Sequence, residues 1–211
     1  MKHDTTQIAA GIATGGDLAQ LVGSRLCHDL ISPLGAIGNG VELLEMSTEF
    51  PGIGDSPEMR LIAESVAAAR ARIQAFRMAF GLAQGDQRVS RAELERLADG
   101  VSSQGRLKVQ MDATDDFARA DVRMVMLALM CLESAMPWGG RVMVLHGSAG
   151  WRLVAEAHRT KTDPALWGCF NDEGRAPAAS EVHFPLLADA ARRSGRRIVW
   201  EVDDNGAEIA F

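Results

Sequence analysis

The sequence predicts an α+β protein, in which an N-terminal helical hairpin forms a dimeric four-helix bundle and a C-terminal α/β sandwich follows. Two observations support this prediction. The first 86 residues contain two long runs whose apolar residues recur at spacings of three and four, the period of an amphipathic helix. After residue 86, short alternating runs mix with helical ones, and all four tryptophans lie there. We therefore divide the chain into domains 1–86 and 87–211.

The first helix is expected over residues 17–46. Its apolar stripe consists of Leu26, Leu30, Pro33, Ile37, Val41 and Leu44. At about 100° per residue, His28 lies on the side of the helix opposite this stripe. It should therefore face solvent or a partner, with Arg25 and Ser32 on the same polar side.

The second helix is expected over residues 57–83, after a turn rich in glycine and proline at 47–56. Its heptad seam consists of Ile62, Val66, Ala69, Ile73, Phe76 and Phe80. Two helices of this length cannot bury both seams against each other alone. A second copy solves the problem by forming a four-helix bundle, so we expect a homodimer. The alternative is that the C-terminal half covers the seam within one chain.

The C-terminal half alternates helices and short strands. Helices are expected over 91–99, 121–136 and 182–194, and strands over 107–111, 141–146, 151–157, 197–202 and 207–211. Residues 160–180 form an irregular segment rich in Pro, Gly and Ala. In the second of these helices, Glu133 is expected to be a solvated position, with a remnant of metal chemistry as the alternative.

Composition excludes several classes of function. A net charge of −6 argues against nucleic acid as a partner. The three cysteines are far apart and form no CxxC, which suits a reducing compartment. Residues 1–16 lack the apolar core of a signal peptide, and no run is long enough to span a membrane. We therefore expect a cytoplasmic protein that binds neither membrane nor nucleic acid.

The residues around His28 favour a catalytic role for it over that of an ordinary surface residue. Asp29 follows directly and can hydrogen-bond an imidazole nitrogen, which suits a phosphoryl-accepting nucleophile. Pro33 removes a backbone hydrogen bond one turn later, and a proline inside a helix costs about 3 kcal/mol. The remaining histidines suggest no metal site, because they show no ligand spacing; they include His146, His158 and His183.

The run from His28 to Leu34 (HDLISPL), followed by Ile37, resembles the H-box of two-component histidine kinases. The longer run 27–44 (CHDLISPLGAIGNGVELL) is similar to the ChpT-type histidine phosphotransferases. The resemblance extends over nearly the whole chain, and it implies that the second half is similar to a kinase ATP-binding (Bergerat) domain.

The resemblance implies that His28 is the phosphorylated histidine and that Asp29 is its acid/base neighbour. It also implies a homodimer that accepts a phosphoryl group from the receiver domain of a hybrid histidine kinase and passes it to response regulator receiver domains. Arg25 and Ser32 are candidate partner-binding residues, with a solvated cation as the equal alternative for Arg25.

The second half decides between a kinase and a phosphotransferase. The histidine kinases that this sequence resembles need an asparagine-bearing helix, an Asp-x-Gly-x-Gly turn and a glycine-rich lid. Residues 127–140 contain no asparagine, and Cys131 stands near its expected place. Residues 158–161 read His-Arg-Thr-Lys, and no Gly-x-Gly follows. Phosphoryl transfer from ATP depends on such positioning and charge neutralisation.

We therefore expect a phosphotransferase with no ATP binding and no autokinase activity. It binds no cofactor of its own, and the partner receiver domain supplies the Mg²⁺. Two alternatives remain open, a sensor kinase with divergent nucleotide motifs and a dimeric scaffold that binds receivers without catalysis.

Overall fold

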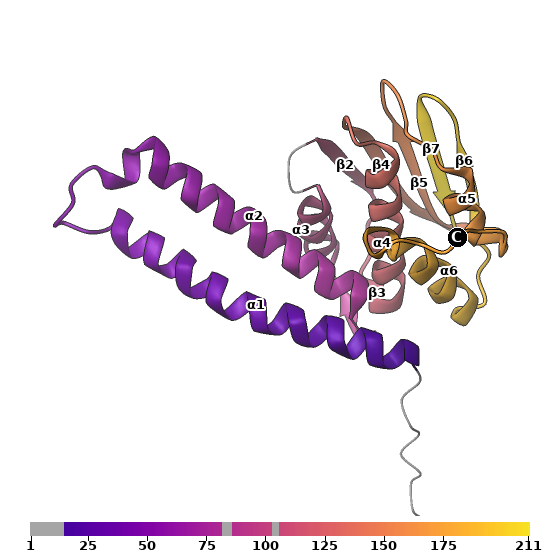
Figure 1. The fold of residues 1–211 in the computed structure, drawn as a ribbon, viewed down its shortest axis with the longest axis horizontal. Helices are drawn as coiled ribbons and strands as arrows, with labels where there is room; N and C mark the ends of the chain where they lie inside the picture. The colour runs from indigo at the N-terminus through magenta and orange to yellow at the C-terminus, as the bar shows by residue number, and fades with distance from the viewer. Residues whose placement is uncertain (1–14, 82–85, 103–105) are drawn as a thin grey trace, which may run out of the picture.

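The computed structural model describes residues 15–81, 86–102 and 106–211. A long helical hairpin projects from a sheet-containing domain (Figure 1). The hairpin consists of α1 (Gly15–Glu45) and α2 (Pro57–Phe80), with the 3-10 helix η1 (Ile53–Asp55) in the connection. The predicted hairpin and the α+β fold are therefore confirmed.

Local chemistry sets the ends of α2. The Ser56 hydroxyl caps its N-terminus by accepting a hydrogen bond from the Met59 amide at 3.1 Å, and Pro57 occupies the first turn. At the other end Gly81 is extended, so the helix ends at Phe80 and before the expected residue 83.

The two helices pack along one face of α1 only. Cys27 and Val41 are buried, whereas the apolar stripe remains half exposed, with exposed fractions of 58% for Leu26, 51% for Leu30 and 50% for Ile37. No described residue of the C-terminal half covers this stripe, so the alternative of burial within one chain does not hold for α1. Val41 is the member of the predicted stripe that α2 covers.

The C-terminal domain is a two-layer α/β sandwich. Its five-stranded sheet has the order β2-β4-β5-β7-β6, in which β2 and β4 are parallel and the other pairs antiparallel. The strands are β2 (Leu107–Asp112), β4 (Gly140–Gly147), β5 (Gly150–Glu156), β6 (Val199–Val202) and β7 (Gly206–Ala210). All five were expected, with ends that differ by one or two residues.

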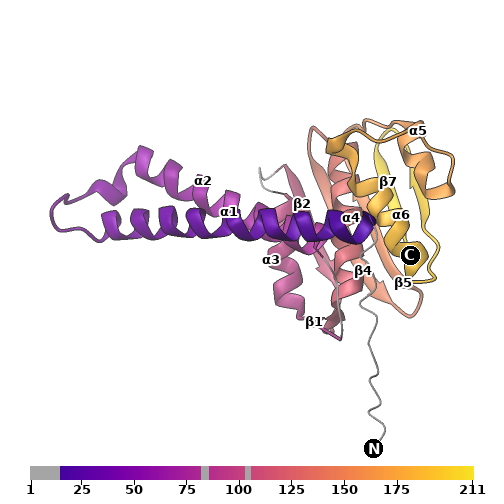
Figure 2. The same ribbon diagram turned by 60° about the horizontal axis from the view of Figure 1, so that its bottom comes forward.

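Helices cover one face of this sheet (Figures 1 and 2). They are α3 (Arg91–Val101), α4 (Arg119–Ala135) and α6 (His183–Arg193). Helix α4 is the centre of the core, since every residue from Val122 to Leu132 is buried. None of the described helices is long and apolar enough to cross a membrane.

Some elements were not expected. β1 (Arg88–Val89) and β3 (Phe117–Ala118) form a small antiparallel pair beside the main sheet. The segment expected to be irregular contains α5 (Pro164–Trp167) and the 3-10 helices η2 (Gly168–Asn171) and η3 (Ala179–Glu181).

Specific contacts fasten the hairpin to the sheet domain. The Arg72 guanidinium of α2 binds both carboxylate oxygens of Glu133 in α4, at 3.1 and 2.9 Å. The buried Arg123 donates from Nε to the Ala79 carbonyl at 3.0 Å. Gly100 lets α3 approach α2 closely, because a Cβ there would lie 2.4 Å from the Ala71 carbonyl oxygen. Glu133 thus forms an ion pair with Arg72 between two helices, and the prediction of a solvated position was wrong.

Candidate functional site

His28 lies on an exposed flank of α1. The preceding residue, Cys27, is 8% exposed and packs towards α2, and burial raises the pKa of its thiol. Because each residue turns the helix by about 100°, His28 projects sideways from the hairpin, and its side chain is 75% exposed. The prediction that His28 points away from the core is confirmed.

Three side chains of α1 form a relay around the imidazole: those of His28 and Asp29, which are adjacent, and that of Arg25, one turn earlier. His28 Nδ1 lies 3.2 Å from Asp29 Oδ1, and Arg25 Nε donates to Asp29 Oδ2 at 2.7 Å. The contact with His28, followed by that with Arg25, holds the pKa of Asp29 below its usual value. A charged carboxylate can only accept hydrogen bonds, so Nδ1 carries the proton. The Nε2 lone pair is then available.

Ser32 and Pro33 follow on the next turn. Ser32 is exposed and lies one turn beyond His28, on the same flank, but among the described residues it forms no hydrogen bond with the relay. Helix α1 continues unbroken through Pro33. Because proline has no N–H, the Asp29 carbonyl receives no hydrogen bond from this position.

An exposed imidazole with a free Nε2 lone pair can act as a nucleophile towards a group that another molecule brings to it. With 75% of its side chain exposed, the imidazole is not enclosed by a pocket of the described residues. Nor does the described part of the chain hold a group of three or more His, Cys, Asp or Glu side chains that could bind a metal ion.

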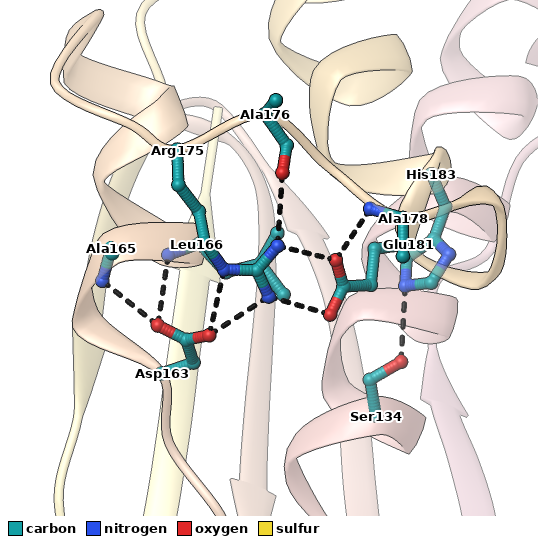
Figure 3. A network of polar contacts seen from close by, with 9 residues as sticks. All are labelled: Ser134, Asp163, Ala165, Leu166, Arg175, Ala176, Ala178, Glu181 and His183. Atoms are coloured by element: carbon teal, nitrogen blue, oxygen red, sulfur yellow. Dashed lines mark hydrogen bonds and ion pairs between the residues drawn. The ribbon is translucent and has the colours of Figure 1, made fainter.

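A second polar cluster lies in the C-terminal domain, in the segment between β5 and α6 (Figure 3). The Arg175 guanidinium binds Asp163, at 3.0 Å from Nε and 2.8 Å from Nη2, and Glu181, at 2.7 Å to each oxygen. The Arg175 contacts lower the pKa of Glu181 to about 2. Asp163 also accepts from the amides of Ala165 and Leu166. One guanidinium thus fastens the segment at two points.

A buried histidine stands beside this clamp. His183 is 6% exposed, and its Nε2 lies 3.0 Å from the Ser134 hydroxyl (Figure 3). Ser134 donates its own proton to the Met130 carbonyl at 3.0 Å, so it accepts from His183 Nε2–H. Burial lowers the pKa of His183 to about 4, which makes it a neutral structural residue at neutral pH.

The cluster borders a cavity of about 300 Å³ between α4, α6 and the β5–α6 segment. Its cationic lining residues are Lys161 and Arg175, and Arg175 is already bound to two carboxylates. Cys131, which the sequence places near the expected asparagine of a kinase, is fully buried in α4. Neither Arg175 nor the Ser134–His183 pair was predicted from the sequence, because no periodic spacing links residues of an irregular segment.

Comparison with known proteins defines the class. The sequence model described as "Histidine phosphotransferase C-terminal domain" matches residues 91–206, more than half of the chain. The chain therefore belongs to the histidine phosphotransferase family. Protein phosphotransferase ChpT of Brucella abortus (strain 2308) is 52% identical to it over 67 residues, which are 32% of this chain and 30% of that protein. The match to this relative thus spans less than a third of its length.

The fold has a counterpart among solved structures. The structure of a bacterial phosphotransferase matches with a TM-score of 0.66 at 23% identity, covering 94% of this chain and 97% of that one. A histidine kinase domain from Erythrobacter litoralis EL346 matches with a TM-score of 0.46 at 14% identity over 83% of this chain and 93% of that one.

The buried His183 predicts a pH-dependent stability. The unfolded chain takes up this proton near pH 6.5 and the folded protein only near pH 4, so the unfolded state binds more protons in between. The free energy of unfolding should therefore fall as the pH drops from 6.5 to 4, by up to about 3 kcal/mol. Urea denaturation at a series of pH values measures this slope.

His183→Gln is the matched variant, since it cannot be protonated. In this variant the free energy of unfolding should change less with pH above pH 4.5. Glu181, whose pKa is lowered in the folded protein, affects this pH dependence mainly below that value. An equal slope in the variant and the parent would assign the effect to other groups.

Proposed function

We propose that this protein is a histidine phosphotransferase of a two-component phosphorelay. His28 accepts a phosphoryl group from the aspartate of a receiver domain, in a hybrid histidine kinase, and passes it to the receiver aspartate of a response regulator. The observation that carries the proposal is the exposed His28 imidazole, with Nδ1 held by Asp29 and Nε2 free, in a chain of this family.

The geometry suits an in-line transfer. The Nε2 lone pair of neutral His28 attacks the phosphorus of the aspartyl phosphate, and the bond from phosphorus to the carboxylate oxygen breaks. The receiver carboxylate leaves with the electron pair, and the phosphoryl group remains on Nε2. Asp29 stabilises the positive charge that develops on the ring through the Nδ1–H bond, and Arg25 holds Asp29 in place. The reverse path serves the next receiver.

No nucleotide takes part in this scheme, and we expect no autokinase activity. A kinase must hold ATP and Mg²⁺ in place for transfer. In this chain Cys131 is buried where asparagine is required, and the cavity beside α4 is lined by the closed Arg175 clamp. The Mg²⁺ that neutralises the transferred phosphoryl group comes from the acidic pocket of the receiver.

The working unit is a homodimer. The stripe of α1 and Ile62 of α2, which is 46% exposed, leave an apolar surface on one flank of the hairpin. Packing this surface against its copy across a two-fold axis gives a four-helix bundle. His28 lies on the other flank, so both copies can present it. We place the phosphorelay in the cytoplasm, in keeping with the three free cysteines at Cys27, Cys131 and Cys169.

The phosphoryl donor is the first test. The purified protein should take no label from γ-labelled ATP and should be labelled rapidly by a phosphorylated receiver domain. His28→Ala should abolish labelling and leave the dimer intact, because the side chain is exposed and its hydrogen-bond partner is Asp29 of the same helix. His158→Ala, at another exposed histidine, is the matched control and should be labelled like the parent. Label retained in the His28 variant would refute the site.

The dimer is the second test. Replacing Leu30 and Ile37 together by glutamate would bury four unpaired charges in the bundle, two from each copy, which costs several kcal/mol. We expect the dimer to weaken at least about a hundredfold, as measured by sedimentation velocity. Leu21→Glu is the matched control, because Leu21 is 46% exposed but lies on the His28 flank. An unchanged dimer in the double variant would exclude this interface.

A further inference from the structure

A basic groove lies between α2 and α3, outside the site described above. It encloses about 300 Å³, and its charged lining consists of Arg77 from α2, Glu93 and Arg96 from α3, and Arg119 at the start of α4. Three guanidinium groups thus face one carboxylate in a chain whose net charge is −6. The local charge is therefore opposite to that of the whole chain.

The guanidinium groups of the groove are largely unneutralised. Across the described residues, neither Arg77 nor Arg119 forms an ion pair or a side-chain hydrogen bond. Arg96 donates a hydrogen bond from Nε to the Ala92 carbonyl at 3.3 Å. Burial, and then the nearby charge of Arg77, lower the pKa of Arg119, while Glu93 acts in the opposite direction. Arginine nevertheless stays protonated at neutral pH. An acidic group in the groove would relieve this repulsion.

The groove lies at the level of His28 along the hairpin. Gly23 of α1 faces Phe80 of α2, and Gly38 faces Val66. This antiparallel register places His28 beside residues 74–78 of α2, which contribute to the groove.

His28 and the groove also share one flank of the hairpin. Cys27 is buried against α2, and the register of the two helices places it opposite Arg77. In two antiparallel right-handed helices, the residues that follow the facing residues by one position lie on the same flank. His28 follows Cys27, and Met78, which lines the groove, follows Arg77. A partner protein that covers His28 on this flank of the hairpin therefore also reaches the groove.

We infer that Arg77, Arg96 and Arg119 form a docking site for acidic side chains of the receiver domain that exchanges its phosphoryl group with His28. This inference rests on the proposed function and names a second contact of the same partner. A receiver that holds Mg²⁺ must present carboxylates around its phosphorylation site, because oxygen ligands bind this ion. Carboxylates at the edge of that surface meet the groove while the reacting aspartate meets His28.

Charges of this kind act on encounter more than on the chemical step. Electrostatic steering raises association rates by about 10- to 1,000-fold and weakens as salt increases. The groove should therefore control kcat/KM and its salt dependence, whereas the relay of Arg25, Asp29 and His28 controls kcat.

The test compares Arg77→Gln/Arg119→Gln with Arg60→Gln, a matched control at an exposed arginine near the other end of α2. Phosphoryl transfer is measured with a receiver domain that labels the parent, at low and high salt. The double variant should lose about tenfold in kcat/KM at low salt, keep kcat within about twofold and show a flatter salt dependence. The control should behave like the parent.

Two further measurements separate docking from structural damage. Arg77→Lys/Arg119→Lys keeps both charges and should retain the salt dependence. Chemical phosphorylation of His28 by phosphoramidate, a small donor that needs no docking, should proceed equally in all variants. A double variant that matches Arg60→Gln, or one that loses kcat but not kcat/KM at low salt, would overturn the docking site. A parent that no receiver labels would instead overturn the proposed function.

Discussion

The 100° turn per residue of an α-helix divides α1 into three faces, and the rest of the molecule depends on this division. Cys27 and Val41 face α2 and close the hairpin. Leu26 and Leu30 lie on a second face, which remains apolar and exposed. His28 lies on the third. Closing the hairpin, forming a dimer and presenting the imidazole therefore make no competing demands on the same side of the helix.

The attachment of the hairpin to the sheet domain determines what lies beside the face of α1 that carries His28. The Arg72–Glu133 ion pair, the bond from Arg123 to Ala79 and the close approach at Gly100 fix α2 against α3 and α4. In our proposal a partner that reaches His28 meets the sheet domain as well, and this domain supports and orients docking. The polar cluster of the domain is satisfied internally by the Arg175 clamp.

Periodicity made much of this structure predictable. The helical hairpin, the five strands of the main sheet and the exposure of His28 follow from local apolar spacing, which each segment carries in its own sequence. The i, i+4 spacing of Arg25 and Asp29 also contained the signal for their ion pair, although we assigned Arg25 to a partner instead. Long-range polar contacts were not predictable in this way. Glu133 meets Arg72 61 residues away, and nothing local marks either residue for the other.

Two kinds of element escaped prediction for different physical reasons. The strands β1 and β3 have two residues each, too few to show an alternating pattern. The helical turns between β5 and α6 are held by one arginine bound to carboxylates 12 and 6 residues away, and no periodic apolar pattern marks these contacts. The groove lined by Arg77, Arg96 and Arg119 arises in the same way, from three helices that only the fold brings together.

The central claim is that the relay of Arg25 and Asp29 leaves Nε2 of His28 as the atom that accepts phosphoryl groups. The most direct measurement is to phosphorylate the protein with a phosphorylated receiver domain and to identify the modified nitrogen. Mass spectrometry locates the residue, and phosphorus–nitrogen NMR correlation identifies the atom. We predict a single phosphohistidine, with phosphorus bonded to Nε2 of His28. A phosphoryl group on Nδ1 of His28, or on any other residue, would contradict this account.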